Sequence, residues 1–235
     1  MKSTLLKFEE FVGKYVDEDV HQFRHGLVID DACPSEWIQK VQKIRLSLPL
    51  DSKRPTVDRR FFRDDEKCIT AMIENIVGDV LESHGYRSKS FDIYCNKYLR
   101  ILEYNRKGAE LLPHTDGTKT CEDTNRKSSH TLLLFLSDCE LGGCTVIMDG
   151  EGDWSKQSNL IVKEECLFSH DDANGQPGQQ QISCNRNIDH ITLGVQPRCS
   201  RIFLFPHKWP HAGEMCDNIP KIVLRAELTL VEIET

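Results

Sequence analysis

Apolar residues recur with helical spacing in two segments near the start of the chain. The first begins near Ser35, a candidate N-cap, and its apolar face comprises Trp37, Ile38, Val41 and Ile44. The second runs from about Asp65 to Ser83 and would end at Gly85; its apolar stripe comprises Ile69, Met72, Ile73, Ile76, Val80 and Leu81. Residues 26–31 read as a short strand, residues 48–64 as a polar loop, and the charged residues 1–25 fit a further helix.

From Phe91 onward the pattern changes to short β-rich runs separated by turn residues. These runs are 98–104, 131–136, 144–148, 159–162, 190–195, 201–205 and 222–231. Two helices followed by about seven or eight strands predict an α+β chain, in which helices buttress a β-sandwich or barrel. A polar, glycine-bearing stretch at 171–181 predicts a surface loop inside the β region.

Composition narrows the class of protein. The 235 residues include 39% hydrophobic residues and carry a formal charge of −7, as expected of a folded domain and unlike a general nucleic-acid binder. No apolar run approaches the roughly 20 residues of a membrane span, and charges interrupt the N-terminus where a signal peptide would be apolar. The ten cysteines include no Cys-x-x-Cys pair, so we expect reduced thiols in an intracellular protein, cytoplasmic or nuclear.

The strongest chemical signal combines His114-Thr115-Asp116 with the distant His211. Residues two apart on an extended segment point the same way, so His114 and Asp116 can reach one ion. Two imidazoles and one carboxylate on one face of a metal form the ligand set of non-haem Fe(II) oxygenases. His170-Asp171-Asp172 repeats the spacing but borders the polar loop, where we expect solvated side chains.

Several motifs occur in the order typical of one family. The stretch from Leu99 to Gly117 resembles the first half of a 2-oxoglutarate/Fe(II) dioxygenase domain of the prolyl 4-hydroxylase type. Further similar segments follow at 131–138, 141–147, 195–198, 201–207 and 211–214. The resemblance extends from about Phe91 to Glu232, well over half of the chain.

This resemblance implies a double-stranded β-helix, which is a jelly-roll or cupin-like fold. We expect a single domain over 1–235, with a helical N-terminal buttress at 1–90 and the jelly-roll core at 91–235. An insertion at about 148–194 is longer than compact family members carry. It could serve as a lid or as a substrate-docking segment.

The resemblance also implies an activity. It predicts a dioxygenase that uses Fe(II), 2-oxoglutarate and O2, with ascorbate as a candidate reductant, and that releases succinate and CO2. The expected substrate is a protein or peptide, with prolyl hydroxylation as the leading hypothesis. Neither a membrane nor nucleic acid is expected as a partner, and the sequence does not specify the oligomeric state.

Site residues follow from the matching positions. His114, Asp116 and His211 are the expected metal ligands; His207 shares strand parity with His211, but the family's His-x-Gly context selects His211. Tyr104 stands ten positions before His114, where the family has a tyrosine that contacts 2-oxoglutarate. Thr145 is a further candidate for lining this pocket.

The far carboxylate of 2-oxoglutarate needs a cation, and two follow His211. Lys221 and Arg225 share a strand face but are separated by roughly 13 Å, so they are not expected to do the same job. An arginine in an apolar strand is costly unless it is paired, which favours Arg225 as the anchor and leaves Lys221 as the alternative.

Three other functions stay open. The domain could be a catalytically silent binding module, although such a module needs no intact ligand triad. It could be a nucleobase or small-molecule oxygenase of the same superfamily. A cupin-like metal protein without 2-oxoglutarate is a third option, but it would have no use for the carboxylate clamp of Tyr104 and Arg225.

Overall fold

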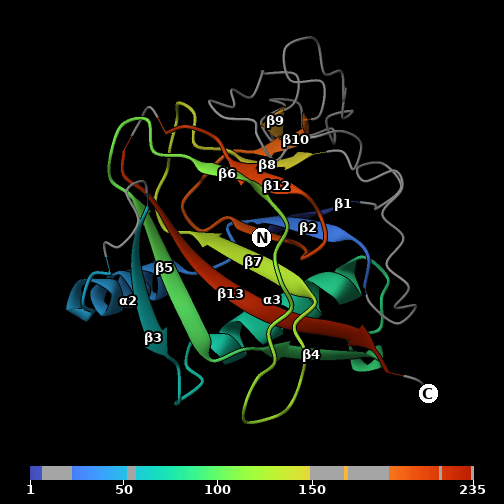
Figure 1. The fold of residues 1–235 in the computed structure, drawn as a ribbon. Helices are drawn as coiled ribbons and strands as arrows, with labels where there is room; N and C mark the ends of the chain where they lie inside the picture. Colours follow the sequence, from blue (N-terminus) through green and yellow to red (C-terminus); the bar gives the residue numbers. More distant parts are fainter. Residues whose placement is uncertain (7–22, 52–56, 149–166, 169–190, 217–218, 234–235) are drawn as a thin grey trace.

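Two β-sheets face each other in the computed structural model, which describes residues 1–6, 23–51, 57–148, 167–168, 191–216 and 219–233 (Figure 1). The larger sheet has the strand order β1-β2-β11-β7-β13-β5-β3, and β4 also pairs with β13. The smaller sheet has the order β6-β12-β8-β10-β9. Every pairing is antiparallel except that of β9 with β10, which fits the expected jelly-roll class.

The larger sheet consists of β1 (Lys2–Leu6), β2 (Gly26–Asp30), β3 (Asp58–Arg63), β4 (Phe91–Cys95), β5 (Tyr98–Tyr104), β7 (His130–Phe135), β11 (Ile202–Pro206) and β13 (Lys221–Glu232). The smaller sheet consists of β6 (Leu111–His114), β8 (Thr145–Met148), β9 (Leu167–Phe168), β10 (Ile191–Val195) and β12 (His211–Gly213). The helices within the described residues are α2 (Ser35–Ser47), α3 (Thr70–Ser83) and the 3-10 turn η1 (Ser88–Ser90).

The period-two pattern of β13 explains how the larger sheet is covered on both faces. Its even-numbered residues Ile222, Leu224, Ala226 and Leu228 belong to a core cluster that also contains residues of α2 and α3. Val223 belongs to a second cluster, shared with residues of the smaller sheet such as Ile147 and Leu193. Successive side chains of a strand point to opposite faces, so one face of the sheet packs on the helices and the other faces the smaller sheet.

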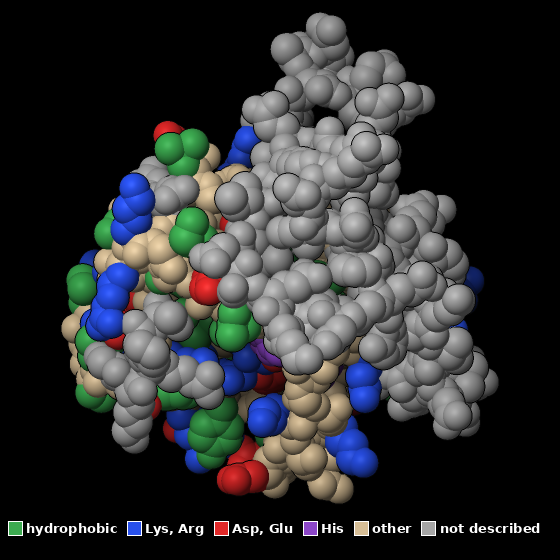
Figure 2. All heavy atoms as spheres, turned by 45° about the horizontal axis from the view of Figure 1, so that its top comes forward, with side chains coloured by type: hydrophobic (Ala, Val, Ile, Leu, Met, Phe, Trp, Pro, Cys, Tyr) green, Lys and Arg blue, Asp and Glu red, His purple; other side chains and the backbone are tan. Residues whose placement is uncertain are grey.

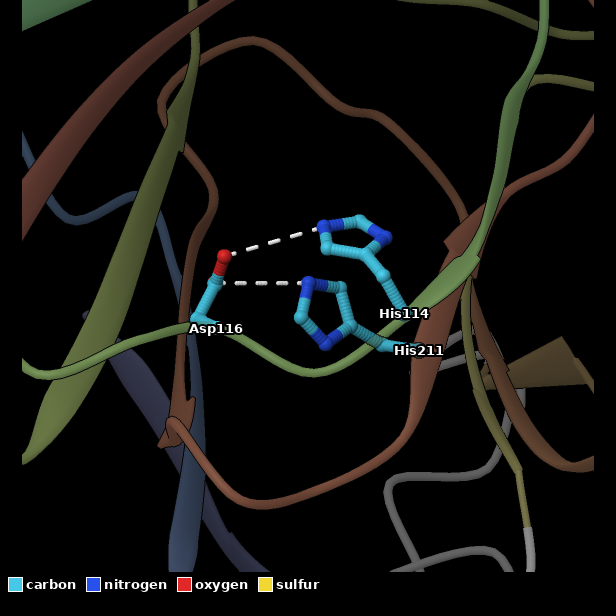
Figure 3. Close-up of side chains that lie close together, drawn as sticks. All are labelled: His114, Asp116 and His211. Carbon is cyan, nitrogen blue, oxygen red and sulfur yellow. Dashed lines mark ion pairs between the residues drawn. The ribbon is translucent and has the colours of Figure 1, made fainter. Parts of the chain in front are cut away.

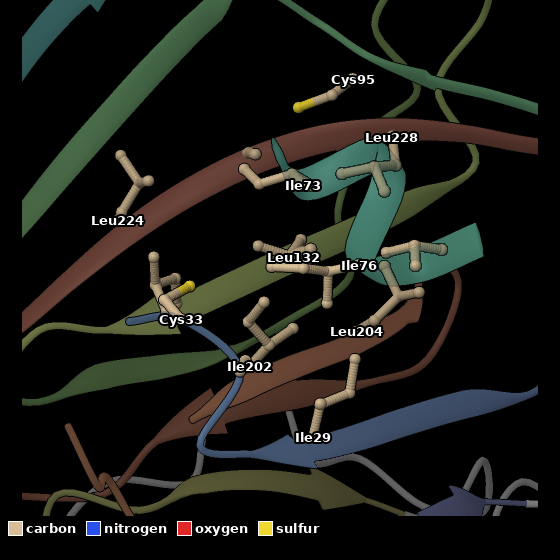
Figure 4. Packing of buried hydrophobic residues seen from close by; sticks show 14 of the residues in the cluster. Ile29, Cys33, Ile73, Ile76, Cys95, Leu132, Ile202, Leu204, Leu224 and Leu228 are labelled. Atoms are coloured by element: carbon tan, nitrogen blue, oxygen red, sulfur yellow. The ribbon is translucent and has the colours of Figure 1, made fainter. Parts of the chain in front are cut away.

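The helix-side core is built from aliphatic side chains. Figure 4 shows Ile73 and Ile76 of α3 beside Leu132, Leu204 and Leu228 of the sheet. Burying each such side chain stabilises the fold by roughly 1.5–3 kcal/mol. The stripe predicted for the second helix is therefore the face that packs on the sheet.

The described part of the N-terminal third contains strands as well as helices. Besides α2 and α3, it supplies β1, β2 and β3 to the larger sheet. The helix expected within residues 1–25 is wrong for Lys2–Leu6, which pairs with β2. The loop expected at 48–64 is wrong for Asp58–Arg63, which pairs with β5 along six residues. Neither segment shows a clear alternation of apolar and polar residues. Both are strands because they pair with neighbouring strands.

Helix starts also differ from the predictions. Ser35 is the first residue of α2 and makes no capping hydrogen bond, because Pro34 occupies the cap position. α3 begins at Thr70 rather than near Asp65. The carboxylate of Asp64 accepts hydrogen bonds from the backbone N–H groups of Cys68, Ile69 and Thr70, which satisfies donors that a helix start leaves free.

Other expected strands match closely, including β5, β7, β8, β10, β11 and β13. β4, β6, β9 and β12 were not expected. The strand expected at 159–162, the polar loop and His170-Asp171-Asp172 lie outside the described residues, as does most of the 148–194 insertion. No helix in the described ranges is both long and apolar enough to cross a bilayer.

Candidate metal centre

The three expected metal ligands meet between the two sheets. His114 ends β6, and its cross-strand partner is His211 at the start of β12; their ring centroids lie 4.3 Å apart. Asp116 follows two residues after His114. One ligand atom from each of the three residues lies within 4.8 Å of the others. Figure 3 shows both imidazoles directed at the Asp116 carboxylate.

Backbone carbonyl groups set the tautomer of each histidine. Nδ1 of His114 lies 2.9 Å from the carbonyl oxygen of Leu112, and Nδ1 of His211 lies 2.9 Å from that of Trp209. A carbonyl oxygen only accepts hydrogen bonds, so Nδ1 carries the proton in both rings. Each Nε2 then presents a lone pair toward Asp116.

The gap between these groups suits a cation. Nε2 of His114 lies 3.6 Å from Oδ1 of Asp116, and Nε2 of His211 lies 3.4 Å from Oδ2. Burial lowers the pKa of His211, which favours the neutral ring. Two lone pairs facing a carboxylate are unfavourable unless a positive ion lies between them. The donor set therefore fits a divalent metal such as Fe(II).

Neighbouring side chains hold the Asp116 carboxylate. Oγ1 of Thr131 donates a hydrogen bond of 2.6 Å to Oδ2, and Nη2 of Arg225 lies 2.7 Å from Oδ1. Burial alone would raise the pKa of this carboxyl. The positive charge of Arg225 acts against burial and lowers the pKa of the carboxyl, which favours its ionised form. Asp116 is thus ionised and fixed in orientation, as a metal ligand must be.

All seven expected site residues line one cavity of about 410 Å³, a volume that includes its opening to solvent. They are Tyr104, His114, Asp116, Thr145, His211, Lys221 and Arg225. In Figure 2 a histidine side chain is visible at the bottom of a hollow, next to basic and acidic side chains. Apolar side chains, among them Leu102, Leu133 and Val223, complete the wall.

Lys221 is fully enclosed at one end of this cavity. It is 2% exposed, and its cross-strand partner on β5 is Tyr104. Nζ lies 4.7 Å from the centroid of the Tyr104 ring and 6.0 Å from that of Phe135. No carboxylate in the described ranges forms an ion pair with it, and burial lowers the pKa of the ammonium group. An anion bound in the cavity would offset that burial.

Arg225 lies elsewhere, beside the metal ligands. Its Nη2 contacts Asp116 and also lies 3.1 Å from Oε1 of Glu227. Glu227 in turn forms an ion pair with Arg100 of β5. The charge that the sequence marked as costly in an apolar strand is therefore paired, and its partner is a proposed metal ligand.

Three polar residues near the candidate metal ligands were not singled out from the sequence: Thr131, Glu227 and Arg100. Thr131 and Glu227 are cross-strand partners on β7 and β13. His207 is buried behind them, and its Nδ1 lies 2.9 Å from Oγ1 of Thr131. Burial lowers the pKa of His207 to about 4, so it supports the site as a neutral ring. Strand parity alone could have indicated Glu227, which shares a face with Arg225.

Comparison with known proteins identifies the fold. No protein-family model matches the chain, and no curated protein matches it in sequence. Solved structures do match. An oxidoreductase of the 2OG-Fe(II) oxygenase family from Burkholderia pseudomallei aligns with a TM-score of 0.53 at 10% identity, over 87% of this chain and 84% of that chain.

Two further structures match to a similar degree. A prolyl-4-hydroxylase from Pseudomonas putida has a TM-score of 0.51 at 12% identity, over 89% of this chain and 93% of its own. The epimerase SnoN from nogalamycin biosynthesis has a TM-score of 0.51 at 11% identity, over 87% of this chain and 78% of its own. Its structure is a complex with Fe3+, alpha ketoglutarate and nogalamycin RO. The resemblance seen in the sequence is confirmed at the level of structure: the chain has the fold of the 2OG-Fe(II) oxygenases, prolyl 4-hydroxylases among them.

Proposed function

We propose that the protein is a non-haem Fe(II)- and 2-oxoglutarate-dependent dioxygenase. The observation that carries this proposal is the joint placement of His114, Asp116 and His211 in one cavity with the buried Lys221. The triad offers a ligand set for Fe(II), and Lys221 offers a cation for a dicarboxylate co-substrate. The fold shared with enzymes of this class supports the assignment.

Nε2 of His114, Nε2 of His211 and the Asp116 carboxylate would hold the iron. When bound, Fe(II) and 2-oxoglutarate would allow O2 to hydroxylate a substrate: one oxygen atom would enter the product, and the other would enter succinate as 2-oxoglutarate loses CO2. Thr131 and Arg225 orient the carboxylate. The carbonyl groups of Leu112 and Trp209 orient the imidazoles.

Lys221, and not Arg225, is the residue we propose for the far carboxylate of 2-oxoglutarate. Lys221 is buried without a carboxylate partner in the described ranges, whereas Arg225 is occupied by Asp116 and Glu227. Tyr104 and Thr145 line the same cavity and would border the co-substrate. The apolar wall of Leu102 and Val223 limits water around it.

A peptidyl substrate remains our leading proposal. The Pseudomonas putida protein of similar fold is a prolyl-4-hydroxylase by name. SnoN, which is described with a nogalamycin compound, marks a small-molecule substrate as the other outcome for this fold.

Anaerobic titration tests the proposal directly. Addition of Fe(II) and then 2-oxoglutarate to the metal-free protein should produce the weak visible charge-transfer absorption of a ternary site. His114→Ala should abolish the absorption by removing a ligand. Lys221→Met should shift it to much higher 2-oxoglutarate concentration. His84→Asn, on the helix side of the fold, is the matched control and should titrate like the wild type.

A second measurement follows 2-oxoglutarate turnover by succinate release. The triad variants should release none above the iron-only background, with ascorbate present throughout. Succinate release that is unchanged in His114→Ala and His211→Ala would overturn the proposal. Tight Fe(II) binding without any response to 2-oxoglutarate would instead favour a cupin-like metal protein.

A further inference from the structure

A second, wider hollow lies beside the metal cavity on the same face of the larger sheet. This groove encloses about 1020 Å³, counting the space at its open side. One wall is formed by the edge strand β3 and by β5, and the other by the loop that joins β6 to β7, which runs in front of β13 in Figure 1. The loop residues that line it are Lys119, Thr120 and Glu122.

The loop is held against the sheet by several contacts. Lys97 and Arg63 both form ion pairs with Asp123, and Sγ of Cys121 lies 3.2 Å from Oη of Tyr94. Arg126 forms an ion pair with Asp92 at 2.7 Å. These contacts fix the loop relative to β3, β4 and β5, so the groove is a preformed feature.

Two exposed aromatic side chains line this groove. Phe61 is 48% exposed and Tyr98 is 42% exposed, and within the described ranges they are the only aromatic side chains among the large exposed hydrophobic residues. They come from neighbouring strands, β3 and β5. Solvent-exposed aromatic side chains that gather in one groove are typical of a binding surface.

The groove continues directly into the metal site. Phe61, Arg100 and Arg225 are successive cross-strand partners on β3, β5 and β13, so their side chains form one row across the sheet. Arg225 lines the metal cavity, and Arg100 and Phe61 line the groove. Glu227 forms ion pairs with both Arg225 and Arg100. Lys221 lies four residues before Arg225 on the same face of β13, away from the groove.

The sequence of residues along β13 places the proposed site for 2-oxoglutarate and the groove on opposite sides of the metal ligands. The co-substrate anchor we propose is at one end, the metal ligands are in the middle, and the groove is at the other end. A ligand in the groove would approach the metal from the side opposite to 2-oxoglutarate. That is the side from which a substrate has to be presented.

The charges in the groove favour a peptide over a nucleic acid. Arg100 is paired with Glu227, and Arg63 is paired with Asp65 and Asp123. The remaining lining charges are one cation, Lys119, and one anion, Glu122. A phosphate backbone requires several uncompensated cations. Aromatic side chains with a few polar groups between them are the recognition surface of extended, proline-containing peptides.

We infer that this groove binds an extended peptide segment that flanks the residue to be oxidised, with apolar or prolyl side chains seated on Phe61 and Tyr98. The inference rests on the proposed function and deepens it by locating the substrate. It also explains how a polymer could be selected by an enzyme whose metal cavity admits little more than one side chain and the co-substrate.

A displayed library of random linear peptides, selected on the immobilised full-length protein, tests this inference without iron or 2-oxoglutarate. The wild type should enrich extended sequences rich in proline or apolar residues. Fluorescence anisotropy then gives the affinity of an enriched peptide carrying a dye. Phe61→Ala combined with Tyr98→Ala should weaken binding at least about tenfold.

Three variants serve as controls. Leu46→Ala removes a side chain that is 69% exposed on α2 and should leave peptide affinity unchanged. Tyr98→Phe keeps the ring and should also bind like the wild type. Lys221→Met should keep peptide affinity while losing the response to 2-oxoglutarate. Thermal unfolding of each variant checks that the fold is retained.

Several results would overturn the inference. They are the absence of any enriched peptide, equal peptide affinity in the double aromatic variant, and binding of a single-stranded oligonucleotide that the same variant loses. None of these results would contradict the proposed function. That proposal fails only if Fe(II) and 2-oxoglutarate produce neither the visible absorption nor succinate release.

Discussion

Nη2 of Arg225 lies 2.7 Å from Oδ1 of Asp116, so a guanidinium charge sits directly beside the carboxylate of the proposed metal ligand. The same nitrogen lies 3.1 Å from Oε1 of Glu227. These two contacts hold the guanidinium beside the proposed metal ligands, away from the end of the cavity where Lys221 lies. We therefore propose Lys221, four residues earlier on the same strand face, for the role that the sequence alone had favoured for Arg225.

Replacing each cation by methionine should separate the two roles. Lys221→Met removes the proposed partner of the 2-oxoglutarate carboxylate and should raise its Kd by roughly thirtyfold, as expected for about 2 kcal/mol of a charged hydrogen bond. Arg225→Met should change that Kd by less than about threefold and should instead weaken Fe(II) binding. Calorimetric titration of both ligands measures the two effects, and the reverse pattern would return the anchor to Arg225.

Thr131 should matter for metal affinity although it is not a ligand. Its Oγ1 donates a hydrogen bond of 2.6 Å to Oδ2 of Asp116 and lies 2.9 Å from Nδ1 of His207. Thr131→Val keeps the shape but removes the hydroxyl, so the carboxylate loses one of its two supports. We expect Fe(II) affinity to fall about 10- to 100-fold.

Thr229→Val provides the comparison for Thr131. Thr229 is also a buried β-strand threonine, and it donates a hydrogen bond of 3.0 Å to the carbonyl group of Lys127, away from the metal. Its replacement should cost stability without changing the Fe(II) affinity. Equal losses of metal affinity in the two variants would show that Thr131 acts only through the fold.

Several elements that were predicted from the sequence have a long, uninterrupted period. β5, β13 and α3 show their alternation or helical stripe over seven residues or more. β6 and β12 carry the two histidine ligands but are four and three residues long, and β6 contains Pro113, which an edge strand tolerates. β8 is equally short, but its run of apolar residues revealed it; β6 and β12 lack such a run, and pairing with neighbouring strands specifies them.

The same distinction applies to the site. The triad was predictable because His114 and Asp116 have a fixed spacing and the family resemblance supplied His211. The partner of Arg225 was not predictable, because it depends on how β13 pairs with β7 and where the Asp116 segment crosses them. The sequence indicated that this arginine needs a partner of opposite charge. The identity of that partner depends on the register of the strands, which the sequence does not specify.

Glu103 should be one of the most sensitive positions for stability. Its carboxylate is 3% exposed and forms ion pairs with Arg45 of α2 and Arg60 of β3, so it links a helix to two strands. Glu103→Leu would leave two arginine side chains largely enclosed without their counter-charge. We expect the free energy of unfolding in urea to fall by roughly 3–5 kcal/mol.

An exposed ion pair supplies the contrast. Arg63 and Asp65 lie 2.6 Å apart, but both side chains are more than 40% exposed. Asp65→Asn should change the free energy of unfolding by less than about 1 kcal/mol. If Glu103→Leu lowers the free energy of unfolding by no more than Asp65→Asn does, the buried ion pairs of Glu103 contribute no more to stability than a surface ion pair.

His130 should make the fold sensitive to mild acid. The residue is fully buried, and burial lowers the pKa of its ring to about 3 from an ordinary value near 6.5. The unfolded chain therefore binds a proton between these values while the folded protein does not. Stability from this group is complete above about pH 6.5 and is lost as the pH falls toward 3.

The size of this effect can be isolated by substitution. Between pH 7 and pH 5 the linkage from His130 should cost about 2 kcal/mol of unfolding free energy. His130→Phe removes the titrating ring and keeps an aromatic side chain beside Phe23, whose ring centroid lies 6.0 Å away. Urea unfolding at the two pH values should therefore show a loss that is smaller by about that amount in the variant, because His207 and the carboxylates titrate in both proteins. An identical pH dependence in wild type and variant would mean that His130 is protonated in the fold, which would require a counter-charge that its surroundings lack within the described ranges.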